Sequence, residues 1–331
     1  MNKLFLYITS LTVALAVASC DDNIPDEQFI KKVSLTKNGL QTYDIEFTEE
    51  GTVDLSIPVN INGTSKNTQD VQVKLTLDQD TLDDYNFERY RYNEELYYLA
   101  PEENMYSFPN GPETTIPAGE DYGIIPLQVH LNNFDLYNNY ILPLRIESVS
   151  AYGIAQSKYS KLLINFNISN FFSGSYSVSG NVWEEATPDQ KLPISSKSLF
   201  TLASNECYLY MGDVEEDDNQ RSEYTMTVAV DKNVYEDRID ETTGARIRKF
   251  TKVTIGTKND DKLLNSEGDA WMEQERTDAP YDNKLENLLT RIYLKYSYMD
   301  LNDPDYPVKK FFEGTLSHTQ SVDKETGEVI N

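Results

Sequence analysis

The chain has 331 residues, and its 55 acidic against 29 basic side chains give a formal net charge of −26 at pH 7. A field of this sign disfavours nucleic acid, anionic membrane surfaces and acidic polysaccharides as partners, and it suits a neutral ligand or a cation. Besides Cys20, the only cysteine and histidine side chains are Cys207, His130 and His318. They lie far apart in the sequence, which argues against a zinc site.

Residues 1–19 have the features of a lipoprotein signal peptide. Lys3 gives a positive start, and the apolar run from Leu4 to Val17 is too short to cross a bilayer. Small residues precede Cys20, as in a bacterial lipobox, so we expect cleavage before Cys20 and attachment of lipid to it. The acyl chains would hold the protein to outer-membrane lipid. The alternative is an ordinary signal peptide with an incidental cysteine.

Residues 20–28 form an acidic tether that begins with Cys20-Asp21-Asp22. Part of its role is that of a solvated linker. Acidic residues at this position also resemble the surface-export signal of Bacteroidetes lipoproteins. That resemblance implies a lipid anchor in the outer membrane, with the body of the protein facing the cell exterior.

Residues 29–169 alternate between apolar and polar side chains with a period of two. The runs Val53–Ile61 and Leu162–Ile168 are typical. Each such run predicts a strand with one buried face, and turn sequences separate the runs. Successive strands without a long helical period predict an antiparallel β-sandwich of immunoglobulin type.

The segment between residues 80 and 98 interrupts these strands. One helical turn is expected over Leu82–Phe87, capped by Asp80 or Thr81. A group of tyrosines follows, of which Tyr97 and Tyr98 are candidates for stacking on a sugar. The competing interpretation is that these rings pack the segment onto the edge of the sandwich.

Several short motifs of this first domain occur in a characteristic order. They are Leu75-Thr76-Leu77-Asp78, Leu82-Asp83-Asp84-Tyr85-Asn86, Tyr98-Leu99-Ala100-Pro101, Thr115-Ile116-Pro117-Ala118-Gly119-Glu120 and Tyr140-Ile141-Leu142-Pro143-Leu144-Arg145-Ile146. Together they resemble the uncharacterised N-terminal domain of Bacteroidetes surface lipoproteins encoded with polysaccharide-utilisation systems, a domain that also resembles a module of some surface endoglycosidases. Ala100 stands where family members usually have leucine. The resemblance implies an immunoglobulin-like fold and a surface location.

Residues 170–331 begin a second series of alternating runs after a junction at Asn170–Ser175. The series predicts a second antiparallel β-domain, either a barrel, with the lipocalin type among the options, or a sandwich. Cys207 is expected to be a small buried residue of one strand. Phe172–Tyr176 and Phe312–Leu316 resemble the C-terminal partner domain of the same lipoproteins.

Two acidic loops in this second domain place oxygen ligands close together, which makes calcium the one cofactor left open. Neither loop has the spacing of an EF-hand, and acidic runs in so acidic a chain are usually solvated turns. The candidate ligands are Asp213, Glu215, Asp217, Asp300, Asp303 and Asp305.

Trp183 and Trp271 are the main candidates for sugar binding. Each is flanked by acidic residues and lies near glycines, which favours loops or strand ends. A ring for stacking beside carboxylates for hydroxyl groups suits a neutral sugar, whereas the alternative is a half-buried ring that seals a barrel mouth.

No pair of carboxylates, phosphate loop or nucleophile motif stands out, so we expect no enzyme. The resulting hypothesis is a surface lipoprotein that binds neutral oligo- or polysaccharide, or supports its capture beside an outer-membrane importer complex. The alternative is a structural or assembly subunit of a surface complex, fimbrial or transporter-associated, that binds no sugar.

Overall fold

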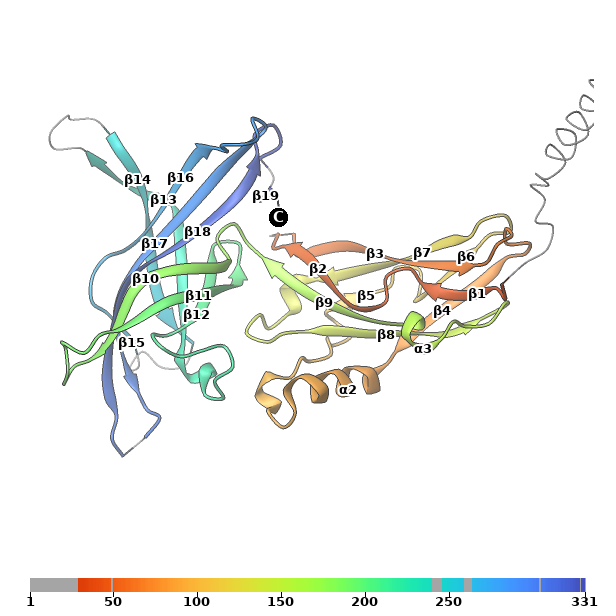
Figure 1. The fold of residues 1–331 in the computed structure, drawn as a ribbon, viewed down its shortest axis with the longest axis horizontal. Helices are drawn as coiled ribbons and strands as arrows, with labels where there is room; N and C mark the ends of the chain where they lie inside the picture. Colours follow the sequence, from red (N-terminus) through yellow and green to blue (C-terminus); the bar gives the residue numbers. More distant parts are fainter. Residues whose placement is uncertain are drawn as a thin grey trace, which may run out of the picture.

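The protein is described here by a computed structural model of residues 29–48, 50–239, 246–258, 264–303, 305–327 and 329–330. The described chain forms two lobes, shown in Figure 1 with the N-terminal lobe on the right. The predicted signal peptide, Cys20 and the tether to residue 28 lie outside the described residues. None of the described helices is long and apolar enough to cross a membrane.

The first lobe consists of two curled, open sheets that pack against each other. Their strand orders are β1-β3-β7-β5 and β2-β9-β8-β4-β6. The strands are β1 (Lys32–Leu35), β2 (Gly39–Glu46), β3 (Thr52–Asn62), β4 (Val71–Leu77), β5 (Tyr106–Ser107), β6 (Glu113–Ile116), β7 (Tyr122–His130), β8 (Ile141–Val149) and β9 (Lys161–Ser169).

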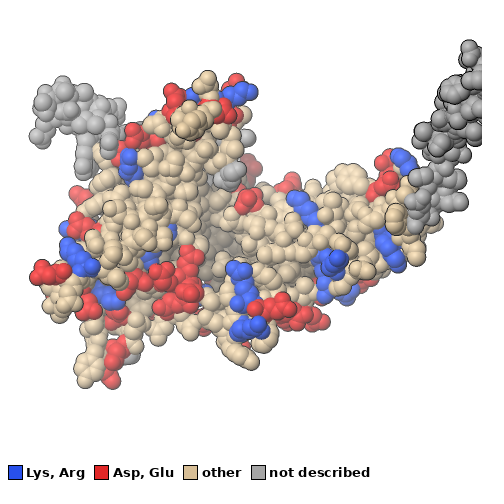
Figure 2. Space-filling view, viewed as in Figure 1, with Lys and Arg blue, Asp and Glu red and all other residues tan. Residues whose placement is uncertain are grey.

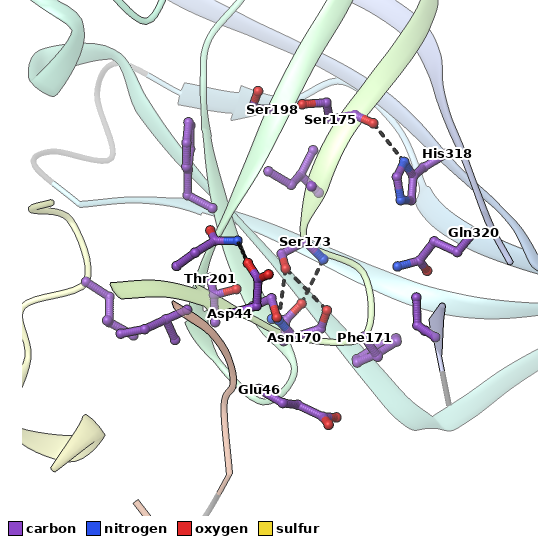
Figure 3. A pocket seen from close by; sticks show the side chains of 18 of the residues that line it. Asp44, Glu46, Asn170, Phe171, Ser173, Ser175, Ser198, Thr201, His318 and Gln320 are labelled. Carbon is purple, nitrogen blue, oxygen red and sulfur yellow. Dashed lines mark hydrogen bonds between the residues drawn. The ribbon is translucent and has the colours of Figure 1, made fainter. Parts of the chain in front are cut away.

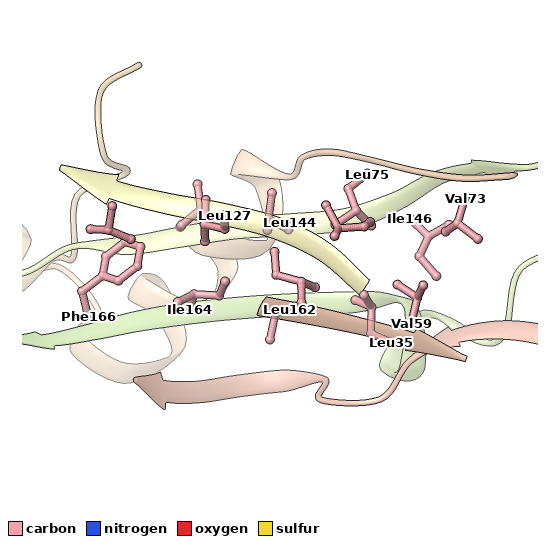
Figure 4. Packing of buried hydrophobic residues seen from close by; sticks show 14 of the residues in the cluster. Leu35, Val59, Val73, Leu75, Leu127, Leu144, Ile146, Leu162, Ile164 and Phe166 are labelled. Carbon is pink, nitrogen blue, oxygen red and sulfur yellow. The ribbon is translucent and has the colours of Figure 1, made fainter. Parts of the chain in front are cut away.

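The predicted alternation holds in these sheets. In β3, for example, Ile57, Val59 and Ile61 are buried, and the residues between them are more exposed. Their side chains and those of the facing sheet fill the space between the sheets, as Figure 4 shows for Val59 and Ile164. Apolar side chains on one face of each strand therefore form a continuous core.

One pairing differs from the predicted antiparallel sandwich. β2 runs parallel to β9, from the pair Gly39↔Leu162 to the pair Glu46↔Ser169. The reason is that β1 and β2 follow each other in the chain but belong to different sheets. The chain therefore crosses between the layers and enters the second sheet beside β9 in the same direction. The immunoglobulin type of the lobe stays a prediction.

Helix α2 (Gln79–Tyr90) is longer than the expected single turn and begins earlier. Thr81 and Asp80 lie inside its first turn, and Asp78 precedes the helix. The Thr81 hydroxyl donates to the Asp78 carboxylate at 2.7 Å, so the predicted cap was placed too late. The remaining short helices are η1 (Glu94–Leu96), η2 (Leu131–Asn133), α3 (Ser157–Ser160) and η3 (Arg221–Tyr224).

The second lobe is a closed antiparallel barrel, which decides between the two predicted options. Eight strands follow one another around it in the order β17-β16-β14-β13-β12-β11-β10-β18, and the pairing of β17 with β18 closes it. The strands of this lobe are β10 (Gly174–Glu184), β11 (Leu192–Ala203), β12 (Glu206–Tyr210), β13 (Thr225–Ile239), β14 (Arg246–Thr257), β15 (Leu264–Ser266), β16 (Ala270–Asp278), β17 (Leu285–Asp300), β18 (Val308–Asp323) and β19 (Val329–Ile330).

The barrel interior is filled over part of its length and polar at one end. Tyr296, Tyr298 and Phe312 are almost completely buried in the filled part. Farther along β18, the alternation that buries Phe312 places His318 and Gln320 on the same inward face. The barrel therefore has a packed end and an end where polar side chains point inward.

Candidate functional site

Trp183 and Trp271 both lie on the outer face of the barrel. Trp183 follows the buried Val182 in β10, and Trp271 stands between the buried residues Ala270 and Met272 in β16. Because successive side chains of a strand point to opposite faces, both indole rings point away from the barrel interior. Each ring is half-buried. The alternative of a ring sealing the barrel mouth does not describe either tryptophan.

Trp183 forms a ring pair with Phe311 of the neighbouring strand. The two residues are register partners of β10 and β18. Their ring centroids are 5.8 Å apart and the planes differ by 10°. The Nζ atom of Lys191 lies 4.6 Å from the Trp183 ring centroid, and Lys309 Nζ lies 4.7 Å from that of Phe311. This pair is therefore an aromatic surface flanked by two cations.

Trp271 forms a second ring pair, with Tyr293 of β17. These residues are also register partners, with ring centroids 5.4 Å apart and planes at 12°. The Phe250 ring packs edge-on against the Trp271 indole, with ring centroids 4.8 Å apart and planes at 85°. The Tyr293 hydroxyl donates to Glu313 Oε1 at 2.9 Å. Burial, together with the neighbouring Glu313 carboxylate, raises the pKa of the Tyr293 phenol.

A polar pair separates the two ring pairs. Lys295 Nζ lies 3.1 Å from Glu313 Oε2. Hydrogen bonds from Lys295 and then Tyr293 lower the pKa of the Glu313 carboxyl, so it is a carboxylate at neutral pH. Ser297 is the register partner of Phe311 on β17, and it lies four positions from Tyr293. The two ring pairs are therefore separated by about 13 Å along the strand.

We name this surface the aromatic wall. It consists of outward-facing side chains from four adjacent strands, namely Trp183, Phe311, Glu313, Lys295, Tyr293 and Trp271. It offers ring edges and faces at two places, and both a donor and an acceptor between them. Such a surface can bind an extended neutral polymer by apolar contact and hydrogen bonds.

The candidate tyrosines lie in the first lobe, away from the aromatic wall. The Tyr98 ring is 6.0 Å from both Tyr85 and Tyr90, and it packs on a small apolar cluster that includes Leu82. Burial, and then Tyr90, raises the pKa of the Tyr98 phenol. The Tyr97 hydroxyl donates to the carbonyl oxygen of residue 91. These contacts favour the packing interpretation for Tyr98.

The two acidic loops are brought together, but around a lysine. Lys310 Nζ lies 3.0 Å from Asp213 Oδ2 and 2.8 Å from Asp300 Oδ2. Of the other candidates, Glu215 and Asp217 are exposed, and Asp303 accepts a hydrogen bond from the backbone of Asp305 at 3.1 Å. Within the described ranges, no three acidic, histidine or cysteine side chains are grouped as a metal site requires. Calcium binding therefore stays a prediction, with no grouping of ligands to support it.

The sequence patterns did not predict Phe311, Tyr293 and Glu313 as site residues. Alternation alone indicates that Tyr293 faces outward, because Ile292 and Leu294 are apolar neighbours of a buried type. It does not reveal that Trp271 lies beside Tyr293, since this depends on the register between two strands.

Figure 2 shows acidic side chains gathered on the lower part of the barrel lobe.

Two protein families match separate parts of the chain, one in each lobe. Residues 25–150 match a family described as a domain of unknown function, DUF4973. Residues 160–317 match a family of C-terminal domains. A search of curated proteins finds no match.

Solved structures match over both lobes. A Bacteroides ovatus protein of unknown function is 22% identical, with a TM-score of 0.77 over 91% of this chain and 100% of that chain. Another from Bacteroides ovatus is 23% identical, with a TM-score of 0.74 over 89% and 94% of the two chains. An auxiliary nutrient binding protein from Bacteroides thetaiotaomicron is 19% identical, with a TM-score of 0.68 over 87% and 93%. The chain thus shares its two-lobe, all-β fold with these Bacteroides proteins.

Proposed function

We propose that this chain is a lipid-anchored protein of the cell surface that binds neutral polysaccharide on the aromatic wall and catalyses no reaction. The observation that carries the proposal is the placement of two ring pairs, Trp183–Phe311 and Trp271–Tyr293, on either side of Glu313 on one outer surface. A surface of this kind remains accessible to a polymer, which could not enter a closed cavity.

The chemistry of the aromatic wall suits an uncharged sugar chain. Pyranose rings present C–H groups that pack on aromatic rings, and their hydroxyls both donate and accept hydrogen bonds. Glu313 offers an acceptor and Lys295 a donor between the ring pairs. A ligand that covers the Trp183 ring must displace Lys191 Nζ from its place 4.6 Å away. This contact is worth only about 0.5–1 kcal/mol at an exposed site, which makes the displacement inexpensive.

Two further observations support the proposal. A net charge of −26 repels acidic polymers and leaves neutral ones unaffected. One protein that shares the fold is called an auxiliary nutrient binding protein, and a polysaccharide can serve as a nutrient. Attachment through Cys20, exposure to the exterior and partnership with an outer-membrane importer complex belong to this proposal, as does a contact of Tyr97 with the sugar.

The test is affinity gel electrophoresis of the soluble chain from residue 21 in gels that contain neutral polysaccharides. We expect wild type to be retarded by at least one polymer without releasing reducing ends from it. Truncating a central ring should weaken binding by about 2 kcal/mol, or roughly thirtyfold, in Trp183→Ala and Trp271→Ala. Tyr281→Ala is the matched control, because Tyr281 is 100% exposed.

Thermal melts must show that each variant is folded. Equal retardation of the tryptophan variants and wild type would remove the aromatic wall from the proposal. Well-folded wild type that binds no neutral polymer would favour the assembly-subunit alternative.

A further inference from the structure

A large cleft lies where the polar end of the barrel meets the first lobe. Its volume is about 1230 Å³. Ligand pockets usually have volumes of about 300–1,000 Å³, so this one has room for more than a single sugar. Residues of both lobes and of the junction between them line it, and Figure 3 shows it from close by.

The first lobe contributes polar side chains from the parallel strand pair. Asp44 and Glu46 of β2 line the cleft with Asn167 of β9. The Asn167 amide donates to Asp44 Oδ1 at 2.6 Å, so the Asp44 carboxylate already has one partner. This wall of the cleft therefore presents oriented hydrogen-bonding groups beside Phe166.

The barrel contributes inward-facing residues from its open end. His318 and Gln320 of β18 line the cleft with Gln274 of β16, which lies beyond the intervening β17, and the lining also includes the apolar side chains of Met272 and Leu199. The His318 Nδ1–H donates to the carbonyl oxygen of Ser175 at 2.8 Å, which fixes the imidazole. The Gln274 amide donates to Thr290 Oγ1 at 3.0 Å. The barrel side thus combines amides with an apolar surface.

The junction after β9 is fixed to the barrel by Asn170. The Asn170 side-chain amide donates to the carbonyl oxygens of Ala203 at 2.8 Å and Glu206 at 3.1 Å. Its Oδ1 accepts from the backbone N–H of Phe172 at 3.1 Å and of Ser173 at 2.9 Å. Asn170 therefore ties the linker to the barrel, and a ligand would meet a cleft that is largely preformed.

Two polar groups that point into the barrel have unused hydrogen-bonding capacity. Within the part of the chain that the structure describes, the side chain of Gln320, labelled in Figure 3, makes no hydrogen bond. The Thr201 hydroxyl is buried at the same cleft, with the residue 4% exposed, and makes no hydrogen bond of normal geometry among described residues, although it lies close enough to the Cys207 thiol to counter the effect of burial on the pKa of that thiol. Ser198 also lines the cleft, but it alternates with the buried Leu199 and points to the outer face of β11. Buried polar groups in folded proteins are almost always paired, so an unpaired one at a cleft points to a ligand.

The charges of the cleft disfavour anionic ligands. Among the described lining residues, Arg276 is the only permanently cationic one, and it forms an ion pair with Glu286. Phosphates and carboxylates therefore find no free cation there. Amides and hydroxyls, which both donate and accept, match sugar hydroxyls, and the apolar side chains of the lining match C–H faces.

We infer that this cleft is a second binding site, which takes a short neutral oligosaccharide or the end of a chain. The inference goes beyond polymer binding on the aromatic wall, because it assigns a different surface and a ligand of different length. Gln320 and Thr201, whose side chains point into the barrel, are the side chains that contact this ligand.

The test is isothermal titration of the soluble chain from residue 21 with neutral oligosaccharides of two to six sugars, prepared from β-glucan, mannan, xylan and galactan. We expect at least one series to bind. Loss of one hydrogen bond should weaken binding about tenfold in Gln320→Ala. Gln190→Ala is the matched control, because Gln190 is exposed outside the cleft.

Gln320→Trp fills the inward-facing end of the cleft and should abolish oligosaccharide binding while retardation by polymer persists. The inference is overturned if no oligosaccharide binds folded wild type, or if the oligosaccharide is lost only in Trp183→Ala or Trp271→Ala. Oligosaccharide binding without polymer binding would keep the cleft and remove the aromatic wall, so the two proposals fail separately. Melts of the Gln320→Ala and Gln320→Trp variants check folding, and side-chain amide NMR of Gln320 gives a readout in wild type itself.

Discussion

Gly180 and Gly314 face each other across the pairing of β10 with β18. A Cβ atom on Gly180 would lie 2.8 Å from the Cα atom of Gly314, and one on Gly314 would lie 2.7 Å from the Cα atom of Gly180. Both contacts are with backbone, which cannot move aside as a side chain can. The two strands therefore approach closely only because neither residue has a side chain.

The first prediction follows from this contact. Gly314→Ala should lower the free energy of unfolding by about 1–3 kcal/mol, the usual cost of overpacking. Urea denaturation followed by circular dichroism measures it. Gly268→Ala is the matched control, because the nearest atom to its Cβ would be 3.9 Å away, and it should leave stability nearly unchanged. Equal stability of the two variants would contradict the close approach.

The second prediction concerns Lys310, between Asp213 and Asp300. Burial favours the neutral forms, but hydrogen bonds from Tyr298 and Lys310 outweigh it and lower the pKa of Asp213. The same balance lowers the pKa of Asp300, and the two carboxylates raise the pKa of Lys310 against the effect of burial. A lowered aspartate pKa stabilises the fold above the unfolded value near 4, and that stability is lost as the pH falls through the folded values.

The lysine sets the upper limit of this range. Its raised pKa stabilises the fold below the unfolded value near 10.4, and that stability is lost as the pH rises through the folded value. Lys310→Met should therefore destabilise the protein at pH 7 by about 3 kcal/mol, because two partly buried carboxylates lose their partner. The loss should shrink below about pH 4. Lys324→Met is the control, since its partner Asp278 is exposed and little change is expected. Thermal melts of wild type and both variants from pH 3 to 9 measure these differences in stability.

The third prediction concerns the anchor. Cys20→Ala should release the protein from the membrane fraction or leave it unprocessed, and should stop incorporation of labelled fatty acid. Label in the variant would contradict the lipobox. External protease should digest the wild-type protein on intact cells, and alanines at Asp21 and Asp22 should reduce this exposure.

The fourth prediction concerns the domain boundary. Fragments 24–169 and 170–331 should each be soluble and melt cooperatively. The bonds of Asn170 to Ala203 and Glu206 remain within the second fragment. Contacts that cutting removes include the Tyr137–Tyr208 ring pair, at a centroid distance of 5.0 Å. Failure of both fragments to fold would mean that the lobes depend on each other.

The sequence predicts which segments form strands better than it predicts which strands pair. Alternation was sufficient to expect buried strand faces and to expect Cys207 inside one of them, where it is 0% exposed. It could not give the parallel pairing of β2 with β9, because residues 39 and 162 are joined by the whole first lobe. No turn joins these two strands to fix their pairing, so their partnership is decided by how the two sheets pack.

The candidate sites show the same limit. The acidic loops were predicted as two separate places, yet Asp213 and Asp300 meet at Lys310. The aromatic wall contains both predicted tryptophans but needs Phe311 and Tyr293, whose positions depend on the barrel closing. The cleft had no sequence signal at all, because its residues come from segments as distant as Asp44 and Gln320.

The closure of the barrel also has a consequence for the order of folding. β9 completes the first lobe before residue 170, whereas β10, the first barrel strand, must wait for β18, which begins at Val308. A chain that emerges with its N-terminus first can therefore finish the first lobe early. The barrel sheet of the second lobe stays open until β18 has emerged. Such long-range pairing is slow. Folding of the second lobe consequently depends on keeping an unfinished sheet from pairing with other chains.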